Sequence, residues 1–371
     1  MEIFRPFGFD KGLFLVTLAL VGVGIIMVFS SSGVLASEKY HQPFYFLVHQ
    51  IIGVGSGLIL ILFIIQIRKP FYQNPYFVYG LLFLTLVLLA MCFLMPSLAK
   101  TNRWVQFLGI RFQPSELAKI SLILFFAYYL DRKSEKLNEF RTLLVPLGAL
   151  FLTILLILKE PDFGTALLIF ILCAILLFIA GVKLKYLGCL GIFSLVLFGF
   201  YLFQASYRVD RIAGFLLPAS DPLGKSFQVI QSKMAVGSGG LLGVSIGEST
   251  QKLFFLPCAH TDFIFAILGE ELGLLGTLGT LTLYALLLWR GVVIFLRVPS
   301  FSGQIAAAGL TLVIAIQALL NISVVLGMGP AKGVPLPLIS FGRSSLVCNL
   351  MAIGILLNIS QRKSLNGKKR I

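Results

Sequence analysis

Residues 165–182 read TALLIFILCAILLFIAGV, a run without one charged side chain. A helix needs about 20 predominantly apolar residues to cross the hydrocarbon core of a bilayer. Comparable runs recur along the 371 residues, of which 58% are hydrophobic and only 12% are charged. We therefore predict an all-α polytopic membrane protein with ten transmembrane helices. The expected spans cover about residues 12–34, 44–67, 76–99, 114–130, 142–159, 165–182, 186–206, 263–289, 303–328 and 344–361.

The formal net charge of +15 comes from Lys and Arg residues in short clusters, most of them between alternate spans. Such clusters are retained on the cytoplasmic side of a membrane. Arg5 and Lys11 near the start and residues 368–370 near the end fall on this side. We therefore expect a multi-pass protein of the cytoplasmic (inner) membrane with both termini cytoplasmic. The dispersed charges argue against nucleic acid as a partner and favour membrane lipids and pyrophosphate groups.

Polar segments collect on the opposite, extracytoplasmic side of the predicted topology. The largest is a loop at residues 207–262, directly before the eighth span. The chain is treated as a single integral-membrane domain, 1–371, with the presumed active site in this loop. Lys and Arg also occur in these outer segments, against the topological bias, and an anionic ligand would explain them.

Asp262 lies where the polar loop becomes the eighth span. Its position favours a helix N-cap, but a carboxylate at the membrane rim is also a candidate general base, typically worth about 10²–10⁴ in rate. His260 is either an interfacial anchor or a proton shuttle. On a regular helix Glu270 and Glu271 would point about 80° and 180° away from Asp262. We expect them to form ion pairs or a polar cavity wall.

The fourth span opens with Glu116 and Lys119, which can pair on one helix face. The pair is either an interfacial ion pair or a buried cation in a cavity that receives a phosphate, and the sequence leaves both open. Arg103 precedes a tryptophan and could be an aromatic-belt anchor. Asp162 lies in a tight outer turn that Pro and Gly explain, although they do not explain the two carboxylates there.

Two further segments contain candidate anion-binding groups. Lys233 precedes a glycine-rich stretch at 237–243, whose backbone amides could approach an anion, although such a stretch usually means a turn. Lys332 and Ser340 flank Pro335-Leu336-Pro337, which interrupts the chain before the last span. Irregular backbone at membrane depth must be buried in protein or line a cavity.

Taken in order, these segments resemble the SEDS family of peptidoglycan glycosyltransferases, which includes FtsW, RodA and SpoVE. The resemblance runs over nearly the whole chain, and the ordered set of motifs is highly specific. The matching segments are Arg103-Trp104, 112–119, 161–165, Gln231-Ser232, Leu256-Pro257, 260–266, 269–273 and 335–340. Residues 43–47 and 331–333 look more like FtsW, the division member. Arg343 departs from the family, where a second glycine normally follows Gly342.

The resemblance implies a ten-span fold that polymerises lipid II, a disaccharide-pentapeptide on undecaprenyl pyrophosphate, on the outer face of the membrane. The family's essential acidic residue falls on Asp262, and its cavity cation and partner carboxylate fall on Lys119 and Glu116. The full set of substrate-binding candidates is Arg103, Glu116, Lys119, Asp162, Lys233, His260, Lys332 and Ser340. Expected partners are a class B penicillin-binding transpeptidase and other divisome or elongasome membrane proteins.

The expected mechanism is a single, inverting displacement at the anomeric carbon with Asp262 as the base. No organic cofactor is expected. A divalent cation, Mg²⁺ or Mn²⁺, could be held by Asp262. Two alternatives from other classes stay open: a flippase that moves lipid II across the membrane, and a non-catalytic division scaffold for the transpeptidase. A flippase needs polar groups reachable from both sides, and only an enzyme should depend on Asp262.

Overall fold

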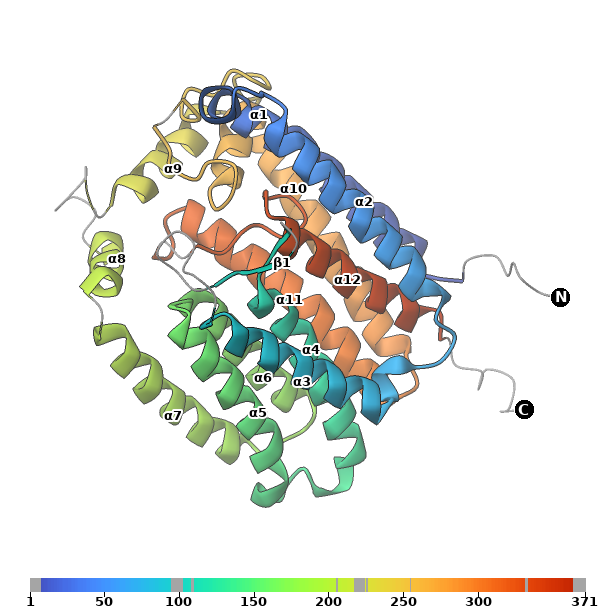
Figure 1. The fold of residues 1–371 in the computed structure, drawn as a ribbon. Coiled ribbons are helices and arrows are strands. Elements are labelled where there is room, and N and C mark those ends of the chain that lie inside the picture. The colour runs from blue at the N-terminus through green and yellow to red at the C-terminus, as the bar shows by residue number, and fades with distance from the viewer. Residues whose placement is uncertain are drawn as a thin grey trace.

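The structure is a computed structural model that describes residues 8–94, 103–107, 110–204, 206–216, 224, 226–253, 255–330 and 333–362. It is almost entirely helical (Figure 1). The long helices are α1 (Lys11–Tyr40), α2 (Tyr45–Gln66), α3 (Pro75–Met91), α4 (Pro114–Arg132), α5 (Phe140–Lys159), α6 (Phe163–Ile179), α7 (Leu184–Phe203), α10 (Ile264–Arg297), α11 (Phe301–Val325) and α12 (Arg343–Ser360). The shorter elements are 3₁₀ turns at Phe71–Gln73 and Ser134–Lys136, strands β1 (Val105–Phe107) and β2 (Ile110–Phe112), and helices α8 (Ser206–Leu216) and α9 (Phe227–Ser238).

The ten long helices correspond one to one with the ten predicted spans. Within the described residues, seven of them are long and apolar enough to cross a membrane. Helices α3 and α6 are shorter but apolar. Helix α4 carries charged side chains at both ends and is shielded by its neighbours, with 16 of its 19 residues buried. The main differences are at the boundaries, since α1 runs on to Tyr40 and α10 runs on to Arg297.

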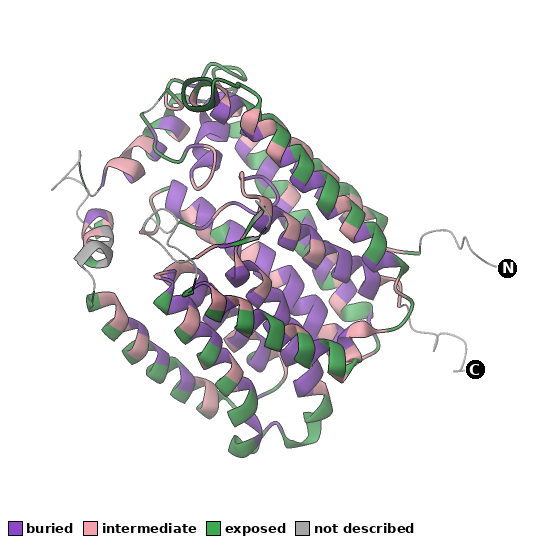
Figure 2. Cartoon of the chain, viewed as in Figure 1, coloured by how far each residue is buried: buried purple, intermediate pink, exposed green. Residues whose placement is uncertain are grey.

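The buried residues concentrate on α4, α11 and α12 in the middle of the bundle (Figure 2). Helix α12 packs tightly against α2, where a Cβ added at Gly57 would overlap the side chain of Leu350. Small residues at such contacts let two membrane helices approach closely, which maximises van der Waals contact where hydrophobic driving force is weak. Helix α7 lies at the periphery, with Ile192 and Leu195 each more than 70% exposed, which suits a lipid-facing helix.

Helix starts follow local sequence signals. Asn74 caps α3 by accepting a hydrogen bond from the amide of Tyr76, and Pro75 occupies the first helical position. Ser300 caps α11 in the same way by accepting from the amide of Gly303. Strands β1 and β2 form an antiparallel hairpin in which Val105 pairs with Phe112. The hairpin leads directly into the buried start of α4.

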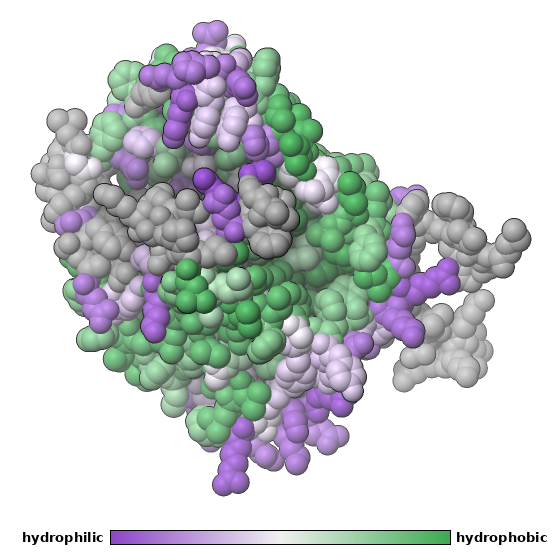
Figure 3. Space-filling view, viewed as in Figure 1, coloured by the Kyte–Doolittle hydropathy of each residue, from purple (hydrophilic) through white to green (hydrophobic). Residues whose placement is uncertain are grey.

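The first helix and the last helix meet at one end of the bundle. The amide of Asp10 donates to Ser360 Oγ at 3.0 Å, so the start of α1 lies beside the end of α12. The hairpin and α9 lie toward the other end (Figure 1). On the molecular surface, a broad apolar band separates hydrophilic regions at the two ends (Figure 3). This is the distribution of a protein that spans a bilayer.

Candidate functional site

Asp262 lies two residues before α10, at the end of the polar loop. The N-cap of that helix is Phe263, so Asp262 does not take the cap position that its place in the sequence favours. Its carboxylate faces the segment that joins α11 to α12: Oδ2 lies 3.6 Å from the point where a Cβ on Gly333 would stand. The loop before the eighth span and the interruption before the tenth therefore meet at this carboxylate, a juxtaposition that the sequence did not predict.

The backbone around Asp262 is held by side chains from the bundle. Asn321 of α11 donates from Nδ2 to the carbonyl oxygen of Asp262 at 2.7 Å and to that of Val334 at 2.8 Å. Ser340 Oγ donates to the carbonyl of Thr261 at 2.5 Å and accepts from the amide of Leu336 at 2.8 Å. Asn321 and Ser340 are both buried. They fix the loop and the 333–340 segment relative to each other.

A chain of polar side chains links this segment to α4. Lys119 Nζ forms an ion pair with Glu116 at 2.9 Å and donates to Gln317 Oε1 at 2.8 Å. Gln317 Nε2 in turn donates to the carbonyl of Pro335 at 3.0 Å. Lys119 and Glu116 are each only 4% exposed, so of the two readings that the sequence left open, the interfacial one is wrong. The predicted pair is buried in the bundle and supports the 333–340 segment through Gln317.

Sequence reasoning did not single out Gln317 and Asn321. Both lie in an otherwise apolar stretch of α11 and are four residues apart, which places them on the same helix face. That spacing was the available signal, because two amides on one face of a membrane helix need partners inside the protein.

Arg103 and Asp162 belong to a second group, at the turn between α5 and α6. Arg103 donates from Nε to the carbonyl of Glu160 at 3.0 Å and from Nη2 to that of Pro161 at 2.5 Å. Asp162 caps α6 by accepting from the amide of Thr165 at 3.2 Å, and it also accepts from Gln113 Nε2 at 3.3 Å. These contacts give both candidates a role in shaping the turn between α5 and α6.

Glu160 in this turn is fully buried. Burial is the largest cause and raises the pKa of its carboxyl to about 8. The hydrogen bond with the Cys92 thiol and the charge of Arg103 lower this pKa, and the charge of Asp162 raises it. The group is therefore largely protonated at neutral pH, because the charged form has lost its hydration without gaining a strong ion pair.

The other three candidates flank the site from the loop side or lie outside the described residues. The side chain of Lys233 on α9 lies so close to Gly327 that a Cβ there would overlap Lys233 Cε. The His260 ring packs on Phe46, with centroids 4.7 Å apart. Burial, followed by the charge of Lys39, lowers the pKa of His260 to about 4, so it is neutral at pH 7. Lys332 lies outside the described residues.

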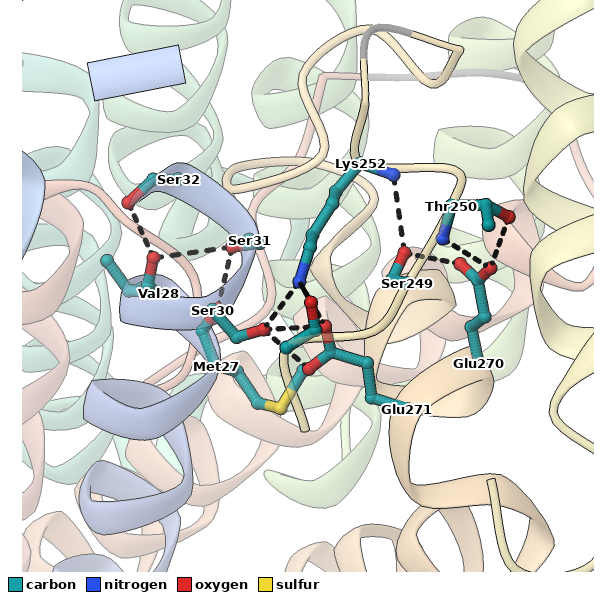
Figure 4. Close-up of polar contacts among 11 residues, drawn as sticks. Met27, Val28, Ser30, Ser31, Ser32, Ser249, Thr250, Lys252, Glu270 and Glu271 are labelled. Carbon is teal, nitrogen blue, oxygen red and sulfur yellow. Dashed lines mark hydrogen bonds and ion pairs between the residues drawn. The ribbon is translucent and has the colours of Figure 1, made fainter. Parts of the chain in front are cut away.

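Glu270 and Glu271 bind residues of the loop and of α1 (Figure 4). Glu270 accepts from Ser249 Oγ at 2.5 Å and from the amide of Thr250 at 3.0 Å. Glu271 pairs with Lys252 Nζ at 2.9 Å and accepts from Ser30 Oγ of α1 at 2.6 Å. We name this set (Ser30, Ser249, Thr250, Lys252, Glu270 and Glu271) the carboxylate clasp. The expected ion pair is confirmed for Glu271.

The clasp lies at a break in α10. Gly273 has φ 63° and ψ −158°, which only glycine adopts readily, so α10 is two helical segments, 264–272 and 274–297. The loop backbone lies against the break. The amide of Val244 donates to the carbonyl of Glu270 at 3.0 Å, and the amide of Leu274 donates to the carbonyl of Gly240 at 2.9 Å. Backbone groups that lose their helical partners at the break thus form hydrogen bonds with the loop. The predicted eighth span did not include this break.

Arg343, the departure from the family pattern, is the first residue of α12. It has a helical conformation, so glycine's freedom is not required there. Its Cγ lies 3.8 Å from the Cβ position of Gly53 on α2. The stem of the Arg343 side chain therefore lies at the α2–α12 contact.

The residues around Asp262 bear on metal binding. In the part of the chain that the structure describes, no group of three or more His, Cys, Asp or Glu side chains is arranged to hold a metal ion. Asp262 is the residue that would hold a divalent cation at this site, and a carboxylate oxygen is a ligand that suits Mg²⁺.

Comparisons with known proteins identify a family with this sequence and this fold. Residues 11–365 match the family FtsW/RodA/SpoVE, described as "Cell cycle protein". Stage V sporulation protein E of Bacillus subtilis is 40% identical over 357 residues, which cover 95% of this chain and 97% of that protein. The probable peptidoglycan glycosyltransferase FtsW of Geobacter metallireducens is 40% identical over 358 residues, covering 95% of each chain.

Solved structures agree with the sequence comparisons. A chain from a structure described as "Structural coordination of polymerization and crosslinking by a peptidoglycan synthase complex" superimposes with a TM-score of 0.77 at 29% identity, covering 95% of this chain and 97% of that chain. The rod shape determining protein RodA of Thermus thermophilus superimposes with a TM-score of 0.69 at 25% identity, covering 96% of this chain and 98% of that chain. The resemblance inferred from the ordered motifs is confirmed, and the chain is a member of the FtsW/RodA/SpoVE (SEDS) family of multi-pass membrane proteins.

Proposed function

We propose that this protein is a peptidoglycan glycosyltransferase that polymerises lipid II into glycan strands on the outer face of the cytoplasmic membrane. The observation that carries the proposal is the placement of Asp262, whose backbone is fixed by Asn321 and whose carboxylate faces Gly333 at the meeting point of two irregular segments. Relatives of the same length at 40% identity are named as probable peptidoglycan glycosyltransferases, which supports this chemistry.

The proposed reaction is a single displacement with inversion. The 4-hydroxyl oxygen of the acceptor sugar attacks the anomeric carbon of the donor, and the bond from that carbon to the lipid pyrophosphate breaks. Asp262 accepts the hydroxyl proton, and the electron pair of the broken bond leaves with the pyrophosphate. The leaving group is already acidic, so it needs cations rather than a general acid.

The cations for the leaving group are proposed from the exposed side of the site. Lys233 lies over Gly327, close to the outer end of α11, and Lys332 is adjacent in sequence to Gly333. Lys119 is committed to Glu116 and Gln317, so we assign it a positioning role. A divalent cation, Mg²⁺ or Mn²⁺, held by Asp262 and pyrophosphate oxygens would supply further charge neutralisation.

We further propose a septal role together with a class B penicillin-binding transpeptidase. Several relatives at 36–40% identity are named FtsW, and a similar chain comes from a complex described as coordinating polymerisation and crosslinking. The relative from Bacillus subtilis named for stage V of sporulation makes spore-wall synthesis the alternative setting. The clusters of Lys and Arg between alternate spans support a topology with both termini in the cytoplasm.

The deciding experiment is glycan-chain formation from labelled lipid II by the purified protein, alone and with its transpeptidase. Asp262→Asn and Asp262→Ala should fold normally and lose polymer formation, by about 10²–10⁴ for a general base. Asp131→Asn, a carboxylate variant in the last turn of α4, is the matched control and should retain activity. Normal polymer from the Asp262 variants would overturn the assignment. No polymer from the unaltered protein would favour the flippase or scaffold readings, which a lipid II translocation assay separates.

A further inference from the structure

A cavity of about 200 Å³ lies at the end of the bundle where α1 begins and α10 and α12 end. It is remote from the proposed polymerisation site, which lies before the start of α10. Its polar lining comes from Asp10, Lys11, Arg290, Arg297, Ser360 and Arg362. A water molecule takes about 30 Å³, so the cavity has room for a phosphate-sized group with its hydration.

The cavity wall has an excess of positive charge. Its one carboxylate, Asp10, is neutralised by Arg290, which donates from Nε to Oδ1 at 2.9 Å and also pairs through Nη2 with Oδ2. Asp10 Oδ1 additionally accepts from the amide of Leu13, capping α1 at 2.9 Å. Four cations therefore face one carboxylate that is already paired.

Two of the cations are uncommitted within the described part of the chain. Lys11 and Arg297 are exposed and have no ion-pair or hydrogen-bond partner there. Arg362, in contrast, is fixed in place, since it donates to the carbonyl of Arg68 at 3.2 Å and lies 5.5 Å from the centre of the Tyr72 ring. Converging cations without protein partners at a cavity indicate an anionic ligand.

The surface beside the cavity is apolar and has the composition of a membrane interface. Trp289, 58% exposed, is adjacent to Arg290, and an exposed Trp next to a cation is typical of the headgroup level. Arg290 and Arg297 share one stripe of α10, and Trp289, Val292 and Leu296 form the neighbouring stripe. The last three are all exposed, Leu296 by 70%. A ligand with a charged head and acyl chains would fit both stripes at once.

We propose that this cavity binds the phosphate headgroup of an anionic phospholipid, with the acyl chains along Trp289, Val292 and Leu296. The apolar stripe is what favours a membrane lipid over a soluble phosphate ester, since only a lipid has chains to cover it. Basic pockets between transmembrane helices bind acidic lipid headgroups by the same combination of charge and apolar contact. This inference is independent of the proposed polymerisation and concerns the opposite end of the bundle.

The test is lipid retention by the full-length protein, measured by native mass spectrometry after incubation with equal amounts of phosphatidylglycerol and phosphatidylcholine. The protein should retain phosphatidylglycerol preferentially. Lys11→Gln and Arg297→Gln should each weaken this retention about fivefold, and together roughly 25-fold, because each cation near an anionic headgroup contributes about that factor. Both side chains are exposed, so thermal unfolding of the lipid-free variants should match the unaltered protein.

Arg141→Gln is the matched control, because Arg141 is an exposed cation at the start of α5 and is not part of the cavity. It should leave retention unchanged. Excess inorganic phosphate should not displace the lipid. Equal retention of the two lipids, or unchanged retention in the double variant, would overturn the proposal, and displacement by phosphate alone would reassign the cavity to a soluble phosphate ester.

Discussion

Acidic residues at and just before the start of α10 are held through different atoms. Glu270 and Glu271 are fixed through their carboxylates, which accept hydrogen bonds or an ion pair from Ser249, Thr250, Ser30 and Lys252. Asp262 is fixed through its backbone carbonyl, which accepts from Asn321. The clasp therefore uses its charge for architecture. At Asp262 the neighbouring amide and hydroxyl groups, from Asn321 and Ser340, position the main chain.

The difference separates acidic residues that lie close together in sequence. Glu271 is buried with its partner Lys252, and a buried ion pair that loses one partner is strongly destabilised. At Asp262 the donors on α11 and in the 333–340 segment act on backbone carbonyls instead. Four substitutions or conditions test this contrast: one at the break beside the clasp, one in the clasp and two at the site.

The largest effect is expected for Gly273→Ala. A Cβ there would overlap the amide of Gly243, and the backbone conformation is one that alanine avoids. The substitution should displace the loop from the break and lower the free energy of unfolding by more than about 4 kcal/mol. Thermal unfolding in detergent measures it. Gly279→Ala is the control, because Gly279 lies on the same helix with open space around its Cβ position, and it should be neutral or slightly stabilising. Equal losses of stability in both variants would contradict the proposed packing of the loop against the break at Gly273.

Glu271→Ala should destabilise the protein by roughly 3–5 kcal/mol, because Lys252 would remain 6% exposed without its carboxylate. The double variant Glu271→Leu with Lys252→Met removes both charges and should lose clearly less stability than the single variant. Denaturation monitored by circular dichroism provides the comparison. If the double variant is less stable than Glu271→Ala, the clasp is held by its hydroxyl hydrogen bonds and not by the ion pair.

Asn321→Leu should lower stability by about 1–3 kcal/mol, since the part-buried carbonyl of Asp262 and the buried carbonyl of Val334 lose their donor. Asn358 offers a matched control: it donates to the carbonyls of Ile64 and Ile67, both at 2.8 Å, at the other end of the bundle. Both leucine variants should lose similar stability. Only Asn321→Leu should also reduce polymerisation of lipid II, by roughly 10–100-fold, through misplacement of Asp262. Parallel losses of activity would count against the positioning role.

The smallest effect is the pH dependence from His260. Its pKa is about 4 in the folded protein and 6.5 when unperturbed. Above pH 6.5 the ring is neutral in both states, and between 6.5 and 4 only the unfolded state binds the proton. Stability should therefore fall as the pH drops through this window, by about 1–2 kcal/mol after solvent screening. Melting curves of His260→Gln should show a shallower fall, and curves with the same slope as the unaltered protein would contradict the assignment.

Sequence patterns predicted the ten helices, because long apolar runs have few alternatives in a membrane. They also predicted that Glu270 and Glu271 would not pair with Asp262. The helical-wheel reasoning was right about separation, although it assumed one regular helix and missed the break at Gly273. Lys252 could not be found, since nothing in its local sequence indicates a partner 19 residues away in the chain. Asn321 and Gln317 were readable as polar residues on one face of α11.

The break in α10 also bears on how the chain enters the membrane. The segment 274–297 contains 24 residues, about 36 Å of helix at 1.5 Å per residue, which exceeds the roughly 30 Å hydrocarbon core. It can therefore be inserted by the translocon as a complete span without Glu270 or Glu271, whose insertion would be unfavourable. Residues 264–272 would then become buried only after α1, α11 and the loop before α10 have assembled around them. Burial of this segment is thus a late step, separate from insertion of the helices.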